Sequence, residues 1–257
     1  MPDPLAATIV VPTHDHGPLV GFAVHSALQQ TVGDLEVFVM GDGVTPETRA
    51  AIESLRREDS RVRFFDHPKG PRLGEHYRHA ALAEARGAIV TYLGDDDLYL
   101  PNHVETVRAA LAGADFAAAF NLVVPPDGPV RIKPSIDVTR EDAHAHMLAH
   151  PDDGIGLSRI SHTLAAYRRL PHGWRTTPAG LMTDRYMVAQ FFEQPWLRAV
   201  NVDAPTVIRF PSRPRADWSL DRRAAETSAM LERLRDPAWR AALAEKVRRR
   251  QERDRSR

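Results

Sequence analysis

The stretch from residue 88 to residue 97 reads Ala88-Ile89-Val90-Thr91-Tyr92-Leu93-Gly94-Asp95-Asp96-Asp97. Its first six residues form a short run rich in branched and aromatic side chains, which is typical of a buried β-strand. Glycine and three consecutive aspartates follow the run directly. The stretch therefore predicts a buried strand that ends in a cluster of carboxylates.

Three more runs of this kind precede it, and segments of helical length separate the four. The runs cover residues 8–11, 35–40 and 62–65. Helices are predicted over residues 19–30, from Thr45-Pro46 onward, and over residues 75–86. Strands and helices that alternate at this spacing are joined by crossover connections. The chain is therefore predicted to be an α/β protein, with a mainly parallel central sheet and helices on both faces.

The pattern changes after a helix predicted over residues 101–112. Residues 116–124 and 130–132 flank a Pro-Pro-Asp-Gly-Pro segment, which predicts a turn between antiparallel strands. Further helices are expected near 140–149 and 184–192, and from Trp218 onward with a break at Asp236-Pro237. We therefore expect one large domain over residues 1–215 and a helical extension over residues 216–257.

Composition excludes several classes of protein. Hydrophobic residues make up 43% of the 257 residues and charged residues 26%, as in soluble globular proteins. The net charge is zero, so no global field attracts nucleic acid. Without cysteine, disulfides, zinc–thiolate sites and thiol nucleophiles are impossible. No apolar run approaches the roughly 20 residues of a transmembrane helix, and the N-terminus does not resemble a signal peptide, so we expect a cytoplasmic location.

The aspartate triplet is the strongest candidate site. Ligands of parallel sheets bind outside the carboxyl ends of the strands, which is where these acids fall. Adjacent carboxylates repel one another unless a cation or solvent screens them, and Mg²⁺ or Mn²⁺ prefers such oxygen ligands together with phosphate and water. The alternative is a solvated acidic turn that caps the helix after Pro101.

Two other strand ends carry candidate residues. Asp42 lies between two glycines and is a candidate hydrogen-bond acceptor for a base or ribose; the alternative is that it closes its own turn. His14 and His16 follow the first strand, but lone His-x-His pairs are usually surface residues rather than metal ligands. The same holds for His144, His146 and His150, which we expect on an exposed helix. Motifs of serine hydrolases, phosphate-loop NTPases and zinc proteases are absent.

Taken together, these segments resemble the family 2 glycosyltransferases, which use nucleotide sugars and have the GT-A fold. The resemblance covers about residues 7–210. It rests on the order and spacing of residues 9–13, residues 26–31, residues 37–43, Arg78, Asp95-Asp96-Asp97 and Thr183-Asp184. It implies a nucleotide-sugar half over about 7–112 and an acceptor half over about 113–215.

The resemblance also implies an activity and roles for single residues. The activity is inverting transfer of a sugar from a nucleoside-diphosphate sugar, with a UDP-sugar favoured, to an acceptor hydroxyl, assisted by Mn²⁺ or Mg²⁺. Donor-binding roles fall on Pro12, Thr13, His14, Asp42, Arg78, Asp95 and Asp96. The metal falls to Asp96 with Asp97 beside it, the catalytic base to Asp184, and weaker acceptor contacts to His162 and Trp174. Asp184 has an alternative role as the N-cap of the helix that follows it.

Some features depart from the family or leave other readings open. Gly41 and Gly94 stand where the family often has acids, and His79 stands where it often has Asn.

Two other functions are possible alternatives. A nucleotide-sugar-binding subunit without turnover would keep Asp42 and Asp96 but would need no base. A nucleotidyltransferase would need a basic glycine-rich loop after the first strand, which residues 14–17 do not supply.

The end of the chain is strongly basic. Residues 246–257 hold seven basic side chains against Glu252 and Asp254. The simplest interpretation is a solvated helix face, and the alternative is peripheral contact with an anionic membrane.

Overall fold

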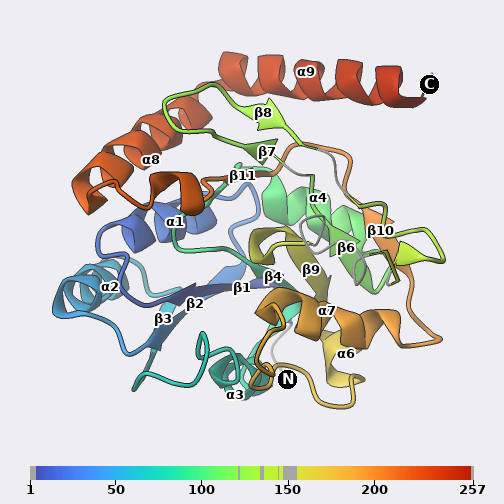
Figure 1. Cartoon of the computed structure of the whole chain (residues 1–257), viewed down its shortest axis with the longest axis horizontal. Helices are drawn as coiled ribbons and strands as arrows, with labels where there is room; N and C mark the ends of the chain where they lie inside the picture. Colours follow the sequence, from blue (N-terminus) through green and yellow to red (C-terminus); the bar gives the residue numbers. More distant parts are fainter. Residues whose placement is uncertain (1–3, 121, 134–135, 144, 147–154, 256–257) are drawn as a thin grey trace.

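The computed structural model describes residues 4–120, 122–133, 136–143, 145–146 and 155–255. A seven-stranded sheet with the strand order β10-β6-β9-β4-β1-β2-β3 forms its centre (Figure 1). These strands are β1 (Leu5–Thr13), β2 (Leu35–Asp42), β3 (Val62–His67), β4 (Gly87–Tyr92), β6 (Phe116–Ala118), β9 (Ile160–Thr163) and β10 (Ala199–Asn201). All neighbours are parallel except β9, which is antiparallel to both β4 and β6. The other six strands therefore direct their carboxyl ends to one edge of the sheet.

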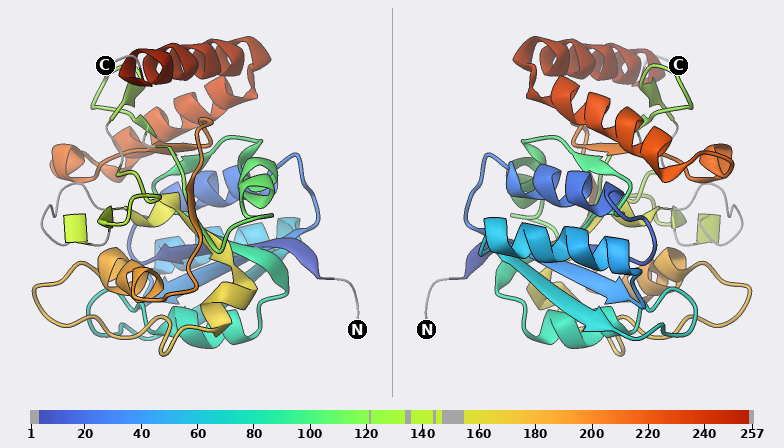
Figure 2. Two further views of the ribbon diagram at one scale, coloured as in Figure 1. Left: turned by 90° about the vertical axis from the view of Figure 1, so that its right-hand side faces the viewer. Right: turned by 90° about the vertical axis from the view of Figure 1, so that its left-hand side faces the viewer.

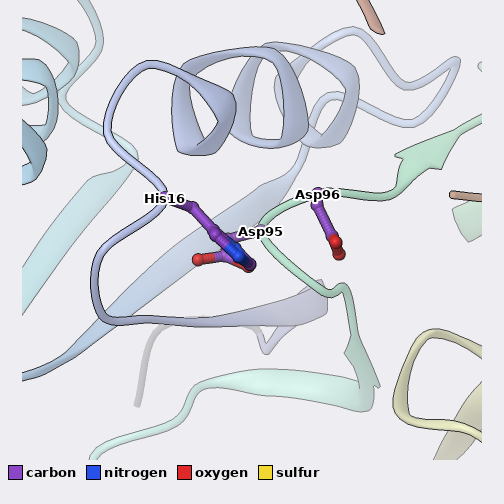
Figure 3. Close-up of side chains that lie close together, drawn as sticks. All are labelled: His16, Asp95 and Asp96. Carbon is purple, nitrogen blue, oxygen red and sulfur yellow. The ribbon is translucent and has the colours of Figure 1, made fainter. Parts of the chain in front are cut away.

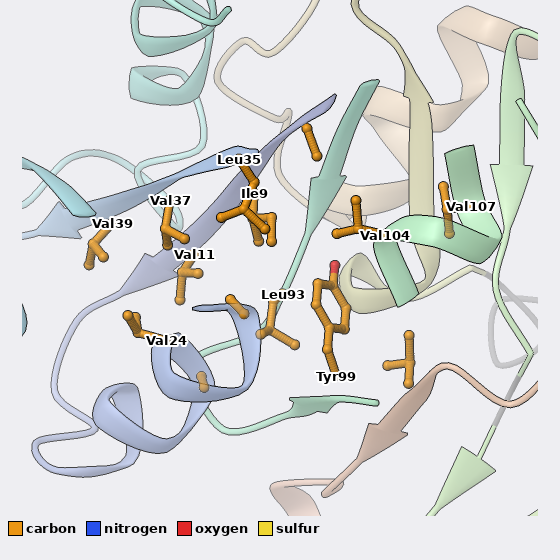
Figure 4. Close-up of a cluster of buried hydrophobic side chains, with 14 of the residues drawn as sticks. Ile9, Val11, Val24, Leu35, Val37, Val39, Leu93, Tyr99, Val104 and Val107 are labelled. Carbon is orange, nitrogen blue, oxygen red and sulfur yellow. The ribbon is translucent and has the colours of Figure 1, made fainter. Parts of the chain in front are cut away.

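Helices cover both faces of this sheet (Figures 1 and 2). One face packs against α1 (Leu19–Leu28), α2 (Pro46–Glu58) and α4 (His103–Ala110), and the other against α3 (Tyr77–Ala83), α6 (Leu164–Arg168) and α7 (Thr183–Phe192). Side chains along β1 alternate between the two cores. Ile9 and Val11 face α1 and α2 (Figure 4). Val10 belongs to the core on the other face. A strand buried on both faces reads as the continuous apolar run seen in the sequence.

A smaller four-stranded sheet carries the C-terminal helices. Its order is β5 (Leu98–Tyr99), β11 (Val207–Arg209), β7 (Leu122–Val123) and β8 (Arg131–Ile132). The helices are α8 (Leu220–Arg235), capped by the Ser219 side chain, and α9 (Pro237–Arg255). Leu243 and Val247 of α9 are buried in the core beneath this sheet. The extension is therefore packed on the domain. Within the described residues, no helix combines the length and the apolar composition of a membrane span.

Most of the predicted elements are confirmed. The four strands and the Thr45 cap lie as predicted, and α8 and α9 meet at Asp236-Pro237. The prediction that residues 116–124 pair as one strand with residues 130–132 is wrong in part. Strand β6 belongs to the large sheet, and only β7 pairs with β8. Helix α3 begins at Tyr77 rather than Glu75, because the backbone before it forms turns with i→i−3 hydrogen bonds, such as that from the Arg78 N–H group to the Glu75 carbonyl. Of the helix predicted near 140–149, residues 144 and 147–149 lie outside the described residues, as does His150.

Candidate active site

A cavity of about 560 Å³ opens at the carboxyl ends of β1, β2 and β4. Segments that are distant in the sequence line it, and five of them carry predicted site residues. These are Pro12 and Thr13 at the end of β1 with His14 directly after it, Asp42 at the end of β2, Arg78 from α3, Asp95 after β4, and Asp184 from α7. The parallel sheet thus brings seven predicted site residues to one cavity, of a size that suits a small-molecule ligand.

Beside this cavity lies a cluster of three potential metal ligands, His16, Asp95 and Asp96 (Figure 3). One ligand atom from each lies within 4.8 Å of the others. The Nδ1 atom of His16 is hydrogen-bonded to Asp95 Oδ1 at 2.7 Å, and this bond raises the pKa of the imidazole. Two carboxylates in reach of one point suit Mn²⁺ or Mg²⁺, which complete their shells with water and phosphate oxygens. The residues present therefore fit a divalent cation.

Asp96 already has two partners from the C-terminal part of the chain. Ser212 Oγ and Arg223 Nη2 each donate a hydrogen bond of 2.7 Å to Asp96 Oδ2. Among the described residues nothing bonds to Oδ1, which remains available as a ligand atom. Arg223 comes from α8, and its side chain is 11% exposed, so the ion pair is shielded from solvent. Sequence patterns did not predict this contact, because it joins residues 127 positions apart.

Asp97 points into the protein instead. Its carboxylate accepts hydrogen bonds from the Ser158 hydroxyl and the Phe210 N–H group, and Arg209 lies 3.8 Å away. Burial, followed by the charge of Asp96, raises the pKa of Asp97 to about 6. The structure therefore places Asp97 where it joins β4 to β11, outside the cluster of His16, Asp95 and Asp96.

The Asp42 carboxylate is held by the loop after β3. Lys69 Nζ and the Gly70 N–H group both donate to it at 2.6 Å. Gly74 approaches so closely that a Cβ there would lie 2.4 Å from Asp42 Cγ, and its φ of +58° also favours glycine. Lys69 lines the cavity and was not singled out from the sequence, although its loop was expected at the ligand-binding edge.

Arg78 brings a buried cation to the cavity. Its guanidinium lies over the Trp174 ring, with 4.5 Å from Cζ to the ring centroid, and burial lowers its pKa. Among the described residues, nothing forms a hydrogen bond with the buried Nη1 atom or with the buried Thr13 hydroxyl of the same cavity. Unsatisfied buried donors are costly, so both atoms indicate a ligand with acceptor oxygens between them.

Asp184 lies in the first turn of α7, partly exposed to the cavity. Its Oδ2 accepts a hydrogen bond from the Leu157 N–H group at 2.9 Å, and the Thr183 hydroxyl lies 3.3 Å from Oδ1. The N-cap residue of α7 is Met182, so the alternative that Asp184 caps its own helix is wrong. Burial raises the pKa of this carboxyl, and the nearby Arg78 charge opposes that effect.

His162 and Trp174 lie in the core behind the cavity rather than in its lining. The Trp174 Nε1–H group donates to the Tyr92 hydroxyl at 2.8 Å. His162 Nδ1 lies 3.0 Å from the Thr163 carbonyl, which only accepts, so Nε2 accepts from the Tyr92 hydroxyl. Burial lowers the pKa of His162 to about 4. Trp174 thus packs against Arg78, and the Tyr92 hydroxyl links Trp174 to His162.

Comparison with known proteins agrees with this geometry. The model of the family described as Glycosyl transferase family 2 matches residues 8–173. The chain belongs to this family. It is 28% identical over 125 residues to the GalNAc(5)-diNAcBac-PP-undecaprenol beta-1,3-glucosyltransferase of Campylobacter jejuni, and 33% identical over 124 residues to the chondroitin synthase of Pasteurella multocida. Each match covers 47% of this chain, but only 39% and 13% of those relatives.

Solved structures share the fold at low sequence identity. TarS 1–349 of S. aureus, in complex with UDP-GlcNAc, aligns with a TM-score of 0.61 and 16% identity, covering 80% of this chain and 59% of that one. The mannosyltransferase PcManGT from Pyrobaculum calidifontis, in complex with GDP-Man and Mn²⁺, aligns with a TM-score of 0.56 and 18% identity, covering 85% and 61%. The GT-A-like α/β fold expected from the sequence is confirmed.

Proposed function

We propose that the chain transfers a sugar, with inversion, from a nucleoside-diphosphate sugar to an acceptor hydroxyl. The observation that carries the proposal is the meeting of Arg78, Asp184 and the His16–Asp95–Asp96 cluster around one cavity. Groups that suit a diphosphate and a carboxylate that suits a hydroxyl proton thus lie around the same cavity. TarS and PcManGT were solved with UDP-GlcNAc and with GDP-Man and Mn²⁺, which supports a nucleotide-sugar donor; we favour a UDP-sugar.

In this proposal Pro12, Thr13 and His14 line the base pocket, and Asp42 accepts a hydrogen bond from the base. Arg78 Nη1 and the Thr13 hydroxyl donate to donor oxygens, which would satisfy both orphaned atoms. Asp95 faces the ribose, and Asp96 holds Mn²⁺ or Mg²⁺ with Asp95 and His16 adjacent. When bound, the cation neutralises charge that develops on the departing diphosphate.

Asp184 acts as general base on the acceptor hydroxyl. Such help is worth about 10²–10⁴-fold, and a base with a pKa raised toward neutrality accepts the proton more readily. The Leu157 N–H group fixes Oδ2, and Oδ1, which accepts a 3.3 Å hydrogen bond from the Thr183 hydroxyl, has a second lone pair for the acceptor proton. Direct attack from this side on the anomeric carbon inverts its configuration.

Donor hydrolysis tests the proposal before the acceptor is known, because water can replace the acceptor hydroxyl. The chain is incubated with a panel of UDP- and GDP-sugars in Mn²⁺, and the anomer released first is identified by proton NMR. We expect hydrolysis of one donor class with inversion, lost in EDTA and restored by added Mn²⁺. Retained configuration, or no turnover of any donor, would contradict it.

A further inference from the structure

A second cavity, of about 420 Å³, opens at the carboxyl ends of β6 and β10. Residues 118–120 and 201–203 line it, together with Arg250 and Gln251 from the end of α9. Because β6 and β10 run parallel to β4, it opens on the same edge of the sheet as the donor cavity. The short helix η2 (Leu157–Arg159) separates the two: Leu157 lines the donor cavity, and Arg159 lines the second.

Arg159 is the unusual residue of this cavity. It is only 2% exposed, and its Nε–H group donates to the Ala119 carbonyl at 2.8 Å. Among the described residues no carboxylate pairs with it, and its other N–H groups make no hydrogen bond. Burial, together with the charge of Arg209, lowers its pKa to about 9. A buried charge without a counter-ion is strongly unfavourable.

A second buried arginine, Arg215, has a carboxylate of the chain as its counter-ion. Arg215 is 1% exposed, and its Nε and Nη2 atoms donate to the two carboxylate oxygens of Glu226 at 2.6 and 2.7 Å. The chain thus provides an internal counter-ion for Arg215 and leaves Arg159 facing a cavity. Within the part of the chain that the structure describes, Arg159 has no such partner, so an anion bound in the cavity would supply it.

The remaining charged side chains stand at the rim. Lys133 and Arg250 are basic, Asp137 and Asp203 are acidic, and all four are exposed. Asp137 accepts hydrogen bonds from Thr139 and from Asn201 of β10, so its charge is partly satisfied within the protein. Arg159 is thus the only charged group in the buried part of this described lining.

We propose that the second cavity binds an oxyanion, a phosphate or a carboxylate, carried by the acceptor. A guanidinium pairs with either group through two parallel hydrogen bonds. The inference rests on the proposed function, because the cavity adjoins the base: Leu157 donates to Asp184, and Arg159 follows two residues later. An acceptor anchored by its anion at Arg159 would reach past η2 toward the Asp184 carboxylate.

NMR of the whole chain with ¹⁵N-labelled arginine tests the site directly. The Nε–H resonance of Arg159 is identified by its absence in Arg159→Met, and the wild type is titrated with inorganic phosphate and, separately, with acetate. We expect a saturable shift at about millimolar concentration. The anion that acts at the lower concentration tells a phosphate acceptor from a carboxylate acceptor. No shift with either anion would overturn the proposal.

Stability measurements give an independent check. We expect Arg159→Met to be as stable as the wild type or more stable without anion, and phosphate or acetate to raise the Tm of the wild type only. Arg215→Met is the matched control and should lose stability, because it strands Glu226. A large loss of stability in Arg159→Met would contradict the missing counter-ion. UDP titration of the same samples separates the two proposals: if UDP fails to bind the wild type, the donor assignment fails while the Arg159 result stands.

Discussion

Arg223 Nη2 of α8 lies 2.7 Å from Oδ2 of Asp96, the carboxylate that we propose as a metal ligand. The C-terminal extension therefore supplies a positive charge at the place where a divalent cation is expected. Burial and the charge of Asp95 both raise the pKa of Asp96, and Arg223 and the Ser212 hydroxyl oppose them. The guanidinium and the cation thus act on the same carboxylate.

The first prediction is that Arg223 weakens metal binding. In Arg223→Met, Asp96 loses its counter-ion, so Mn²⁺ should bind about fivefold more tightly in the absence of nucleotide. Arg222→Met is the matched control, because Arg222 pairs with the exposed Asp127 instead. Mn²⁺ titration followed by electron paramagnetic resonance gives both dissociation constants. Equal affinities in the two variants would show that Arg223 and the metal do not compete.

Substitutions of the neighbouring residues Asp96 and Asp97 should have different effects. Asp96→Asn keeps the shape of the side chain but loses a charged ligand, so Mn²⁺ binding should fall while the Tm changes little. Asp97→Asn instead weakens the contacts of Asp97 with Ser158 and Arg209, so the Tm should fall by several degrees. Thermal denaturation with and without Mn²⁺ measures both effects. If Mn²⁺ raised the Tm of Asp96→Asn as much as it raises the Tm of the wild type, Asp96 would not be a metal ligand.

Asp184→Asn removes proton acceptance and preserves shape. We expect donor turnover to fall by about 10²–10⁴-fold, with nucleotide binding close to that of the wild type. The acid limb of the pH profile of kcat/KM should lie above the ordinary aspartate value, because burial raises the pKa of Asp184. A rate within about threefold of the wild type would overturn the assignment of Asp184 as the base.

His162 should make stability depend on pH. Its pKa is about 4 in the folded chain and about 6.5 when unfolded, so below pH 6.5 the unfolded state binds more protons. Stability should therefore fall as the pH is lowered from 6.5 toward 4. In His162→Gln this slope should be shallower by about 1.4 kcal/mol per pH unit. Urea unfolding at pH 7, 6 and 5 measures it, and identical slopes would contradict a neutral buried imidazole.

The basic C-terminus should not bind membranes. The apolar residues of α9 pack on the domain, and Arg248 and Arg249 form ion pairs with Glu245. We expect the chain to stay in the supernatant when vesicles containing phosphatidylserine are sedimented at physiological salt. Co-sedimentation that disappears in an Arg248→Ala, Arg249→Ala double variant would favour the membrane alternative.

Short sequence patterns predicted the strands and the edge of the sheet at which the site lies. The apolar runs of β1, β2 and β4 identified the strands, and their parallel order placed Asp42, Asp95 and the residues after Pro12 at one edge. The position of Asp184 at a helix start could be predicted, but its partner Leu157 could not, because that contact depends on how residues 155–192 fold against one another. The contact of Arg223 with Asp96 likewise depends on how α8 packs on the domain, which the helical pattern after Trp218 does not determine.

The central claim is that the cavity at β1, β2 and β4 binds a nucleoside diphosphate through a cation at Asp96. Calorimetric titration of UDP and GDP, in Mn²⁺ and in EDTA, tests it most directly. We predict that one of them binds the wild type with a stoichiometry of about one, and that EDTA or Asp96→Asn weakens binding at least about tenfold. Failure of both nucleotides to bind in Mn²⁺, or equal binding by the wild type and Asp96→Asn, would contradict the claim.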